Sequence, residues 1–198
     1  MKNIQKQSIP QIDMIMHNVV WTITPRPVWI VGTCNEDGTP NLSTITCVSN
    51  TPGPPENIIV SMAARHTVSN ILRTGEFSVN LANAEMTALV DYVGTTSGID
   101  GKKDAMPYDF IWGDKLHVPV LAPSHCVFEC KVSHTHVVGG FHTFFGEVAN
   151  LHIGASLVPP TEPIEAIRKW FGELDIHATD PLVYHSVLKY FHVGEKTK

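Results

Sequence analysis

The sequence is poor in charge and carries no cluster of basic residues. Only 17% of its 198 residues are Asp, Glu, Lys or Arg, and the net charge is −5. Proteins that bind nucleic acid usually carry a Lys/Arg-rich stripe, so the sequence does not support this class of partner. Hydrophobic residues make up 43% of the chain, which is typical of a globular protein and not of a disordered one.

Long apolar runs are absent, and cysteine is scarce. Residues 1–8 show no signal-peptide pattern, and no segment is apolar enough for a membrane helix, so we expect a soluble, cytoplasmic protein. Two cysteines flank a predicted hairpin and are expected to face prolines, while the other two share one strand, so we expect no disulfide. The four cysteines are Cys34, Cys47, Cys126 and Cys130.

The chain also lacks internal repeats, low-complexity runs and a Gly-x-Gly-x-x-Gly motif. Without that glycine motif, a separate dinucleotide-binding domain is not expected. We therefore interpret residues 1–198 as a single domain, which is long enough to bury well over half of its surface.

Turn signals divide the chain into short strands and a few short helices. Asp37-Gly38 and Gly139-Gly140 predict hairpin turns. On the first helix, Val68, Ile71 and Leu72 form the expected apolar face. Strands joined by hairpins, with few helices, favour a mainly β protein built as an antiparallel barrel. The predicted elements are strands 27–34, 41–49 and 58–62, helix 67–74 with Gly75 after it, strand 77–81, helix 84–93 stopped by Gly94, an irregular segment 95–119, strands 126–138 and 141–153, helix 162–172 and strand 182–185.

The eleven histidines do not form a metal-binding motif. His134 and His136 share one face of a predicted strand. In the register of the hairpin Val137 faces His142, which puts His136 and His142 on opposite faces. No carboxylate or cysteine stands at a typical ligand spacing, so we predict no metal site.

The stretch from Ser61 to Ile71 is the most informative part of the chain. It predicts the end of a buried strand, a turn that carries Arg65, and a helix opened by Thr67. A helix start offers unpaired N–H groups and a partial positive charge to a phosphate, and a guanidinium adds a matching fork of donors. An ordinary Thr-capped helix beside a solvated arginine fits the same residues, so both interpretations stay open at this point.

Five short motifs follow one another along the chain. They are Pro25–Val28, Asp37–Ser43, Arg65-x-Thr67-x-x-Asn70-Ile71-x-x-Thr74-Gly75-Glu76-Phe77-x-Val79-Asn80, His142–Val148 and Pro181–Tyr184. In this order and spacing they resemble the flavin reductase-like family, and the flavoredoxin branch is the nearest match, over about residues 19–194. The resemblance implies an FMN-binding split β-barrel, usually a homodimer with the flavin near the subunit interface.

The resemblance also implies a set of site residues. The FMN phosphate would lie at the helix start, where Arg65 neutralises charge, Thr67 donates its hydroxyl, and Asn70 orients the loop or the ribityl chain. Strand 43–50 would run beside the flavin ring with its even-numbered side chains on one face, although a Thr-rich strand without ligand contacts fits any single residue equally well. The remaining expected contacts are Ser43, Thr44, Thr46, Cys47, Val48, Ser61, Ala63 and Asn80, the last of which faces either the ligand or water.

The function implied by the resemblance is that of an FMN-dependent oxidoreductase. The flavin carries the redox chemistry, so no side chain is singled out as catalytic. Two roles fit: an NAD(P)H:flavin reductase with NAD(P)H as a transient donor, or flavoredoxin-type electron transfer with a redox protein partner. A non-redox FMN-binding or sensory barrel is the alternative. Relatives often carry an aromatic residue where this chain has 46–48, and a basic residue after Gly98; both departures concern nicotinamide recognition more than FMN binding.

Overall fold

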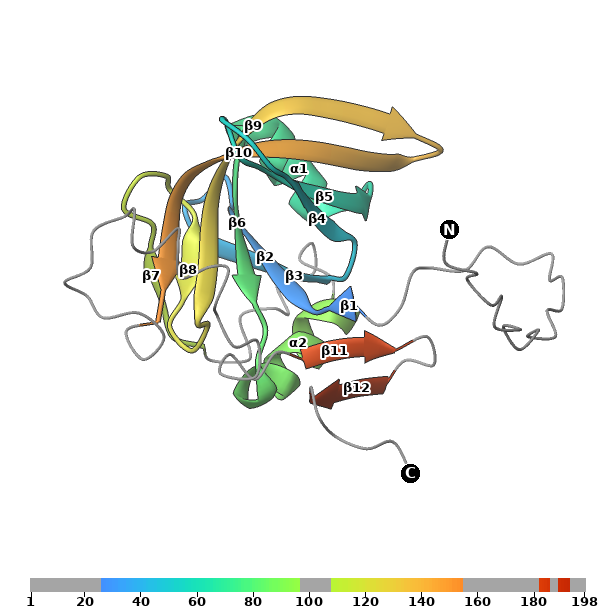
Figure 1. Cartoon of the computed structure of the whole chain (residues 1–198), viewed down its shortest axis with the longest axis vertical. Coiled ribbons are helices and arrows are strands. Elements are labelled where there is room, and N and C mark those ends of the chain that lie inside the picture. Colours follow the sequence, from blue (N-terminus) through green and yellow to red (C-terminus); the bar gives the residue numbers. More distant parts are fainter. Residues whose placement is uncertain (1–25, 97–107, 155–181, 186–188, 193–198) are drawn as a thin grey trace, which may run out of the picture.

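The computed structural model of the chain describes residues 26–96, 108–154, 182–185 and 189–192. A seven-stranded sheet dominates this part of the chain, in the order β3-β2-β6-β9-β10-β5-β4 (Figure 1). All of its neighbouring strands are antiparallel. Its strands are β2 (Trp29–Cys34), β3 (Pro40–Ile45), β4 (Val48–Thr51), β5 (Asn57–Ala63), β6 (Glu76–Leu81), β9 (Cys126–Val138) and β10 (Phe141–Ile153).

The other elements pack around this sheet. One smaller sheet combines β1 (Arg26–Pro27), β11 (Leu182–His185) and β12 (Lys189–His192), and a second pairs β7 (Phe110–Trp112) with β8 (Pro119–Leu121). The helices are α1 (His66–Thr74), the short 3-10 turn η1 (Ala84–Met86) and α2 (Thr87–Thr95). No helix among the described residues combines the length and apolar character needed to cross a bilayer.

The two edge strands of the large sheet, β3 and β4, are consecutive in the chain. Only Thr46 and Cys47 lie between them, so the chain passes from one edge of the sheet to the other within two residues. A sheet whose edges come this close is strongly curled and leaves a split between its first and last strands. The expected mainly β split-barrel fold is confirmed.

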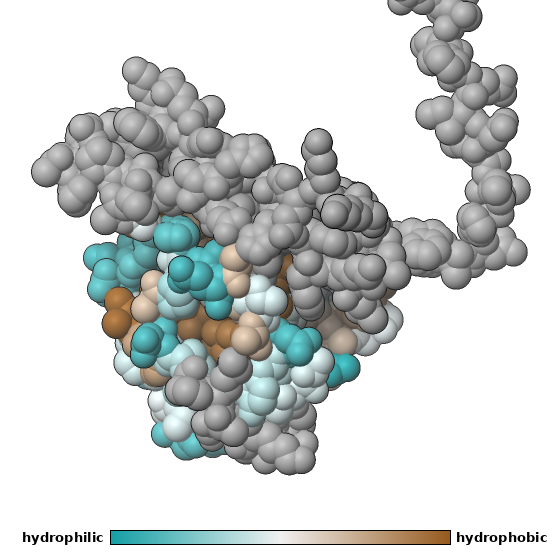
Figure 2. All heavy atoms as spheres, turned by 90° about the horizontal axis from the view of Figure 1, so that it is seen from below, coloured by the Kyte–Doolittle hydropathy of each residue, from teal (hydrophilic) through white to brown (hydrophobic). Residues whose placement is uncertain are grey.

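Two apolar clusters hold the barrel together. One packs α1 against the sheet and includes the fully buried rings of Phe77 and Phe144. The other packs α2 and η1 against the sheet and includes Leu42, Val90 and Leu121. Seen from below, the described surface shows a strip of apolar atoms between hydrophilic side chains (Figure 2).

Helix α1 differs from its prediction in two ways. It begins at His66, with Arg65 as the residue before the first turn, and no side chain caps it, so the expected Thr67 cap is wrong. Thr67 is buried and accepts a hydrogen bond from Asn41 instead. Leu72, expected on the apolar face, is 58% exposed, whereas Val68 and Ile71 are buried as predicted. The buried apolar face of α1 is therefore narrower than predicted. The other buried positions of the helix are polar and are occupied by Thr67 and Asn70.

Other element boundaries also shifted. The single strand expected over 41–49 is divided into β3 and β4. Helix α2 continues through Gly94, which lies so close to Thr44 that an added Cβ would stand 3.3 Å from the Thr44 Cβ. This glycine therefore permits close packing of the helix on β3 and does not stop the helix. The segment 95–119, expected to be irregular, contains β7 and the first residue of β8. The helix expected over 162–172 lies outside the described residues.

The long hairpin is confirmed in its strands and its turn. Gly139 and Gly140 adopt positive φ angles of 55° and 81°, and His142 pairs with Val137 as predicted. The hairpin extends beyond the neighbouring strands (Figure 1). At an irregularity in the register, Gly146 lies beneath Phe77, where an added Cβ would stand 2.5 Å from the Phe77 Cζ. The sheet can curl here because no side chain intervenes.

Candidate functional site

The turn between β5 and α1 brings unpaired donors together. Arg65 has an extended backbone (φ −136°, ψ −177°), is exposed, and has no side-chain hydrogen bond that caps the helix. The first turn of α1 contains no acidic residue. The first N–H groups of a helix have no partner within the helix, so this corner offers backbone donors, the helix dipole and a guanidinium to an anion.

Polar side chains under the first turn tie α1 to the β2–β3 hairpin. Asn41 Nδ2 donates to Thr67 Oγ1 and to Thr33 Oγ1, both at 3.0 Å. Asn70 Nδ2 donates to Thr33 Oγ1 at 3.2 Å and to Asn35 Oδ1 at 2.8 Å. Asn70 is 3% exposed and holds the β2–β3 hairpin loop. The start of α1 is therefore fixed in place by buried hydrogen bonds.

The tip of the long hairpin flanks the same turn. Ala64 N–H donates to Gly140 O at 3.2 Å, and Ala63 pairs with Phe141 across the sheet. One step further along β10, Thr143 Oγ1 donates to Ser61 Oγ at 3.0 Å. The predicted contacts Ser61 and Ala63 therefore lie on β5, beside β10 and the turn that leads into α1.

The even-numbered side chains of the predicted strand 43–50 do not share one face, as the positions of Thr44 and Val48 show. Thr44 Oγ1 donates to Val90 O at 2.6 Å and so faces α2, whereas Val48 packs against the apolar cluster beneath α1. The alternation fails because the chain crosses the split at Thr46 and Cys47. Ser43 and Thr46 are half-buried, and Cys47 is exposed.

Cys47 lies close to two neighbours from other elements. Its carbonyl accepts a hydrogen bond from Ser61 N–H at 3.0 Å, and its Sγ lies 3.4 Å from Arg26 Nη1. The thiol is free, as are the other three, in agreement with the sequence. The structure thus brings Cys47, Ser61, Ala63 and the start of α1 together along one edge of the barrel.

Asn80 lies elsewhere and faces neither of the two surroundings expected for it. Its side chain is fully buried, donates to Ile30 O and Ser78 Oγ at 3.0 Å each, and accepts from Leu121 N–H at 2.9 Å. The prediction assumed that the side of β6 opposite Phe77 was open, but β8 covers it. The side chain of Asn80 therefore links β2 and β6 to β8.

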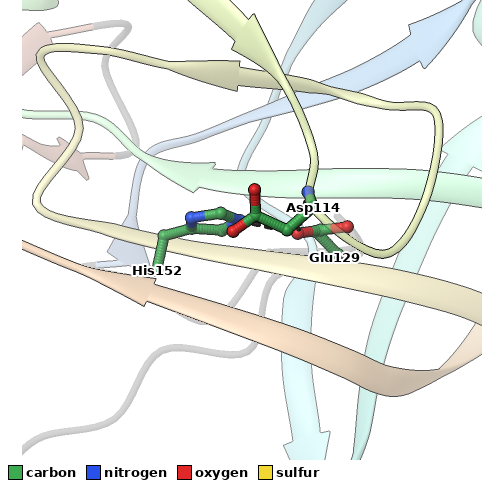
Figure 3. Close-up of side chains that lie close together, drawn as sticks. All are labelled: Asp114, Glu129 and His152. Carbon is green, nitrogen blue, oxygen red and sulfur yellow. Dashed lines mark hydrogen bonds and ion pairs between the residues drawn. The ribbon is translucent and has the colours of Figure 1, made fainter.

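A second polar cluster involves Asp114, Glu129 and His152, whose potential ligand atoms all lie within 4.8 Å of one another (Figure 3). No sequence motif indicates this cluster, because 15 residues separate Asp114 from Glu129 and 23 separate Glu129 from His152. Strand pairing brings β9 and β10 together and sets Glu129 beside His152, with Nε2 and Oε1 2.6 Å apart.

The oxygens of the Glu129 carboxylate are engaged by N–H donors. The backbone N–H groups of Asp114, Lys115 and Leu116 donate at 2.7 to 3.0 Å, and Asn150 Nδ2 donates at 2.8 Å. Burial raises the pKa of Glu129, but these hydrogen bonds and that of His152 outweigh it and lower the pKa to about 2. The cluster therefore holds an ionised carboxylate that fastens the loop before β8.

Sequence reasoning missed the residues that support the candidate site. Thr33 and Asn41 are almost fully buried, and Asn35 and His66 meet at 2.8 Å between Asn35 Oδ1 and His66 Nε2. One sequence signal could have indicated these residues. A polar residue in β2 or β3, at a position where the alternation predicts a buried side chain, needs a buried partner.

Comparisons with known proteins agree with the fold. The family model described as "Flavin reductase like domain" matches residues 21–187. Flavoredoxin from Methanosarcina acetivorans is similar in structure, with a TM-score of 0.76, 25% identity and 95% of each chain covered. Flavoredoxin of Desulfovibrio vulgaris (Miyazaki F) has a TM-score of 0.77 and 23% identity, with 93% of this chain and 96% of that one covered. An FMN-binding protein from Thermus thermophilus has a TM-score of 0.71 and 19% identity, with 96% and 99% covered.

Proposed function

Because the chain belongs to the flavin reductase-like family, we propose that it is an FMN-binding redox protein whose α1 start holds the flavin phosphate. The observation that carries this proposal is the uncapped first turn of α1 beside the exposed Arg65. Family membership supports a flavin-binding redox function, and the phosphate distinguishes FMN from other flavin forms such as riboflavin. The donor set of this corner fits a dianion, since it offers N–H groups and a guanidinium, and the first turn of α1 contains no acidic residue.

The proposed roles of the residues follow from their places. Arg65 and the N–H groups of the first turn bind the phosphate, and Thr67 adds its hydroxyl. Ser61, Ala63 and Cys47 line the edge along which the rest of the flavin extends, and small side chains there let the backbone approach it. Bound FMN supplies the hydride or electron chemistry, and the protein residues bind and orient it. Asn80 and Thr44, which are engaged with β8 and α2, have no role in this proposal.

The test compares FMN with riboflavin, which lacks the phosphate. Arg65→Ala should weaken FMN binding by about 10- to 150-fold, the scale of one charge-assisted hydrogen bond, and leave riboflavin binding unchanged. Lys131→Ala, an exposed basic residue on β9, is the matched control and should change neither affinity. The phosphate site would be contradicted if a folded Arg65→Ala variant lost affinity for FMN and riboflavin equally, or kept its full affinity for FMN.

We further propose flavoredoxin-type electron transfer as the physiological role. Two flavoredoxins match this chain over more than nine-tenths of its length. In anaerobic titration, the FMN-loaded protein should be bleached rapidly by a reduced redox protein and slowly by NADH or NADPH. Rapid bleaching by either nucleotide would instead assign the role of an NAD(P)H:flavin reductase. A protein that binds FMN without turnover in either assay would be a non-redox or sensory barrel. Four free thiols favour a cytoplasmic location.

We also propose a homodimer joined through the tip of the long hairpin. Val137, Val138 and Phe141 are 53%, 63% and 55% exposed there, on a hairpin that extends beyond the neighbouring strands (Figure 1). Exposed apolar side chains grouped in this way are typical of an interface. Replacing Val138 and Phe141 together by Glu should yield monomers in sedimentation experiments. Leu72→Glu, at a site on α1 that is 58% exposed, should not. Unchanged dimers in the double variant would exclude this interface.

A further inference from the structure

Six polar side chains lie together under the first turn of α1, and we refer to them as the Asn41 cluster. Its members are Thr33, Asn35, Asn41, His66, Thr67 and Asn70. Four of them are almost completely excluded from solvent, with exposures of 0% for Thr33, 2% for Asn41, 3% for Asn70 and 4% for Thr67. Buried polar groups are normally paired, so each donor and acceptor in such a cluster can be accounted for.

The amide donors of the cluster are fully used. Asn41 Nδ2 gives its two hydrogens to Thr33 Oγ1 and Thr67 Oγ1, and Asn70 Nδ2 gives its two to Thr33 Oγ1 and Asn35 Oδ1. Asn35 Oδ1 also lies 2.8 Å from His66 Nε2. A carbonyl oxygen only accepts, so His66 Nε2 must carry a proton. This part of the network is closed.

The network is open at Thr67. Because Thr67 Oγ1 accepts a hydrogen from Asn41, its own hydroxyl proton cannot point back at that amide and must point elsewhere. None of the hydrogen bonds among the described residues supplies an acceptor for it. In the same amide, the buried Asn41 Oδ1 also has no partner. An unmatched donor therefore lies in the first turn of α1, two residues from the exposed Arg65.

We propose that Asn41 is a positioning residue for the FMN phosphate, because it fixes the Thr67 hydroxyl as a donor toward the ligand. Without the Asn41 amide, this hydroxyl is free to rotate and to donate within the protein. The inference rests on the proposed phosphate site and adds a residue to it that does not itself touch the ligand. A purely structural role for Asn41, which would only pin α1 to β3, predicts that all ligands are affected alike.

The readout is the ratio of the affinities for FMN and for riboflavin, measured by quenching of flavin fluorescence. This ratio isolates the phosphate, since a general loosening of the site lowers both affinities. Thr67→Val should lower the ratio by about tenfold. Thr95→Val is the matched control, because its hydroxyl donates to Asp91 O at 2.8 Å within α2 and is not part of the Asn41 cluster. It should leave the ratio within about twofold even if it lowers stability.

Asn41→Ala should lower the ratio by about fivefold, and the double variant Asn41→Ala, Thr67→Val should be no worse than Thr67→Val alone. If Asn41→Ala does not fold, Asn41→Asp replaces it: a carboxylate only accepts, so it turns the Thr67 hydroxyl inward and should also lower the ratio. An unchanged ratio in a folded Asn41 variant, or additive losses in the double variant, would overturn the positioning role. Equal affinities of the unmodified protein for FMN and riboflavin would instead overturn the phosphate site itself.

Discussion

The buried carboxylate of Glu129 should make a large, pH-dependent contribution to stability. In the folded protein its pKa is lowered from 4.5 to about 2, because hydrogen bonds to the charged form outweigh the cost of burial. A group whose pKa is lowered on folding stabilises the protein above its unfolded pKa and loses this effect as the pH falls through its folded pKa. The difference corresponds to about 3 kcal/mol at pH 7, of which about 2 kcal/mol is lost by pH 3.

Glu129→Gln removes the charge and keeps the shape. The amide of glutamine has only one oxygen, so its NH2 end would face donors such as the Leu116 N–H, which now donates to Glu129 Oε2 at 2.7 Å. We expect this substitution to lower the free energy of unfolding by about 3 kcal/mol at pH 7. Glu147→Gln, at an exposed position of β10, is the matched control and should change it by less than about 0.5 kcal/mol.

The assay is urea unfolding followed by tryptophan fluorescence at pH 7, 5 and 3. The difference between the original protein and Glu129→Gln should stay nearly constant from pH 7 to 5 and shrink to about 1 kcal/mol at pH 3, because Glu129 itself is then protonated on unfolding. A difference that is the same at all three pH values would refute the reasoning. So would a difference no larger than that of the Glu147→Gln control.

Three further predictions follow from other parts of the structure. Only Cys47 should react quickly with Ellman's reagent in the native protein, because it is exposed. Burial raises the pKa of the other three thiols, that of Cys126 to about 12. Bound FMN should slow the reaction of Cys47 if the flavin lies along this edge. Gly146→Ala should lower the free energy of unfolding by about 2–3 kcal/mol through its clash with Phe77, whereas Gly140→Ala, in open space at positive φ, should cost about 1 kcal/mol in the same unfolding assay. Asn80→Leu should cost about 2–4 kcal/mol by thermal unfolding because it leaves buried backbone groups unpaired.

Much of the fold could be predicted because local signals decide it. Glycine pairs and Asp-Gly set the hairpins, and Gly75, at φ 72°, ends α1 as expected. The predictions of element boundaries that were wrong depended on contacts between segments distant in the sequence. The break of the strand after Ile45 reflects the closing of the barrel, and α2 continues through Gly94, whose lack of a side chain leaves room for Thr44. No pattern within a short window contains either contact.

Local signals in the sequence predict where the candidate site begins, but not the residues that support it. Arg65 lies between the end of β5 and the start of α1 as predicted, because the end of a strand and the start of a helix leave local signals in the sequence. The role of Thr67 as a cap was wrong, since Asn41, 26 residues away, engages its hydroxyl. Asn80 shows the same limit: alternation placed it correctly opposite Phe77, but the covering strand β8 comes from 41 residues further along the chain.

The cluster around Glu129 and the start of α1 differ in whether the chain supplies an acceptor for the local N–H donors. This difference indicates which of the two has a structural role and which can bind a ligand. Near Glu129, three consecutive backbone N–H groups donate to a carboxylate that the chain itself provides, so their hydrogen bonds are satisfied inside the protein. At the start of α1, the first turn contains no acidic residue, no side chain caps it, and the exposed Arg65 precedes it. Folding would favour a cap here, as it favours Glu129 there. That the sequence places none, and adds Arg65 instead, is best explained if the anion that completes this corner comes from a ligand.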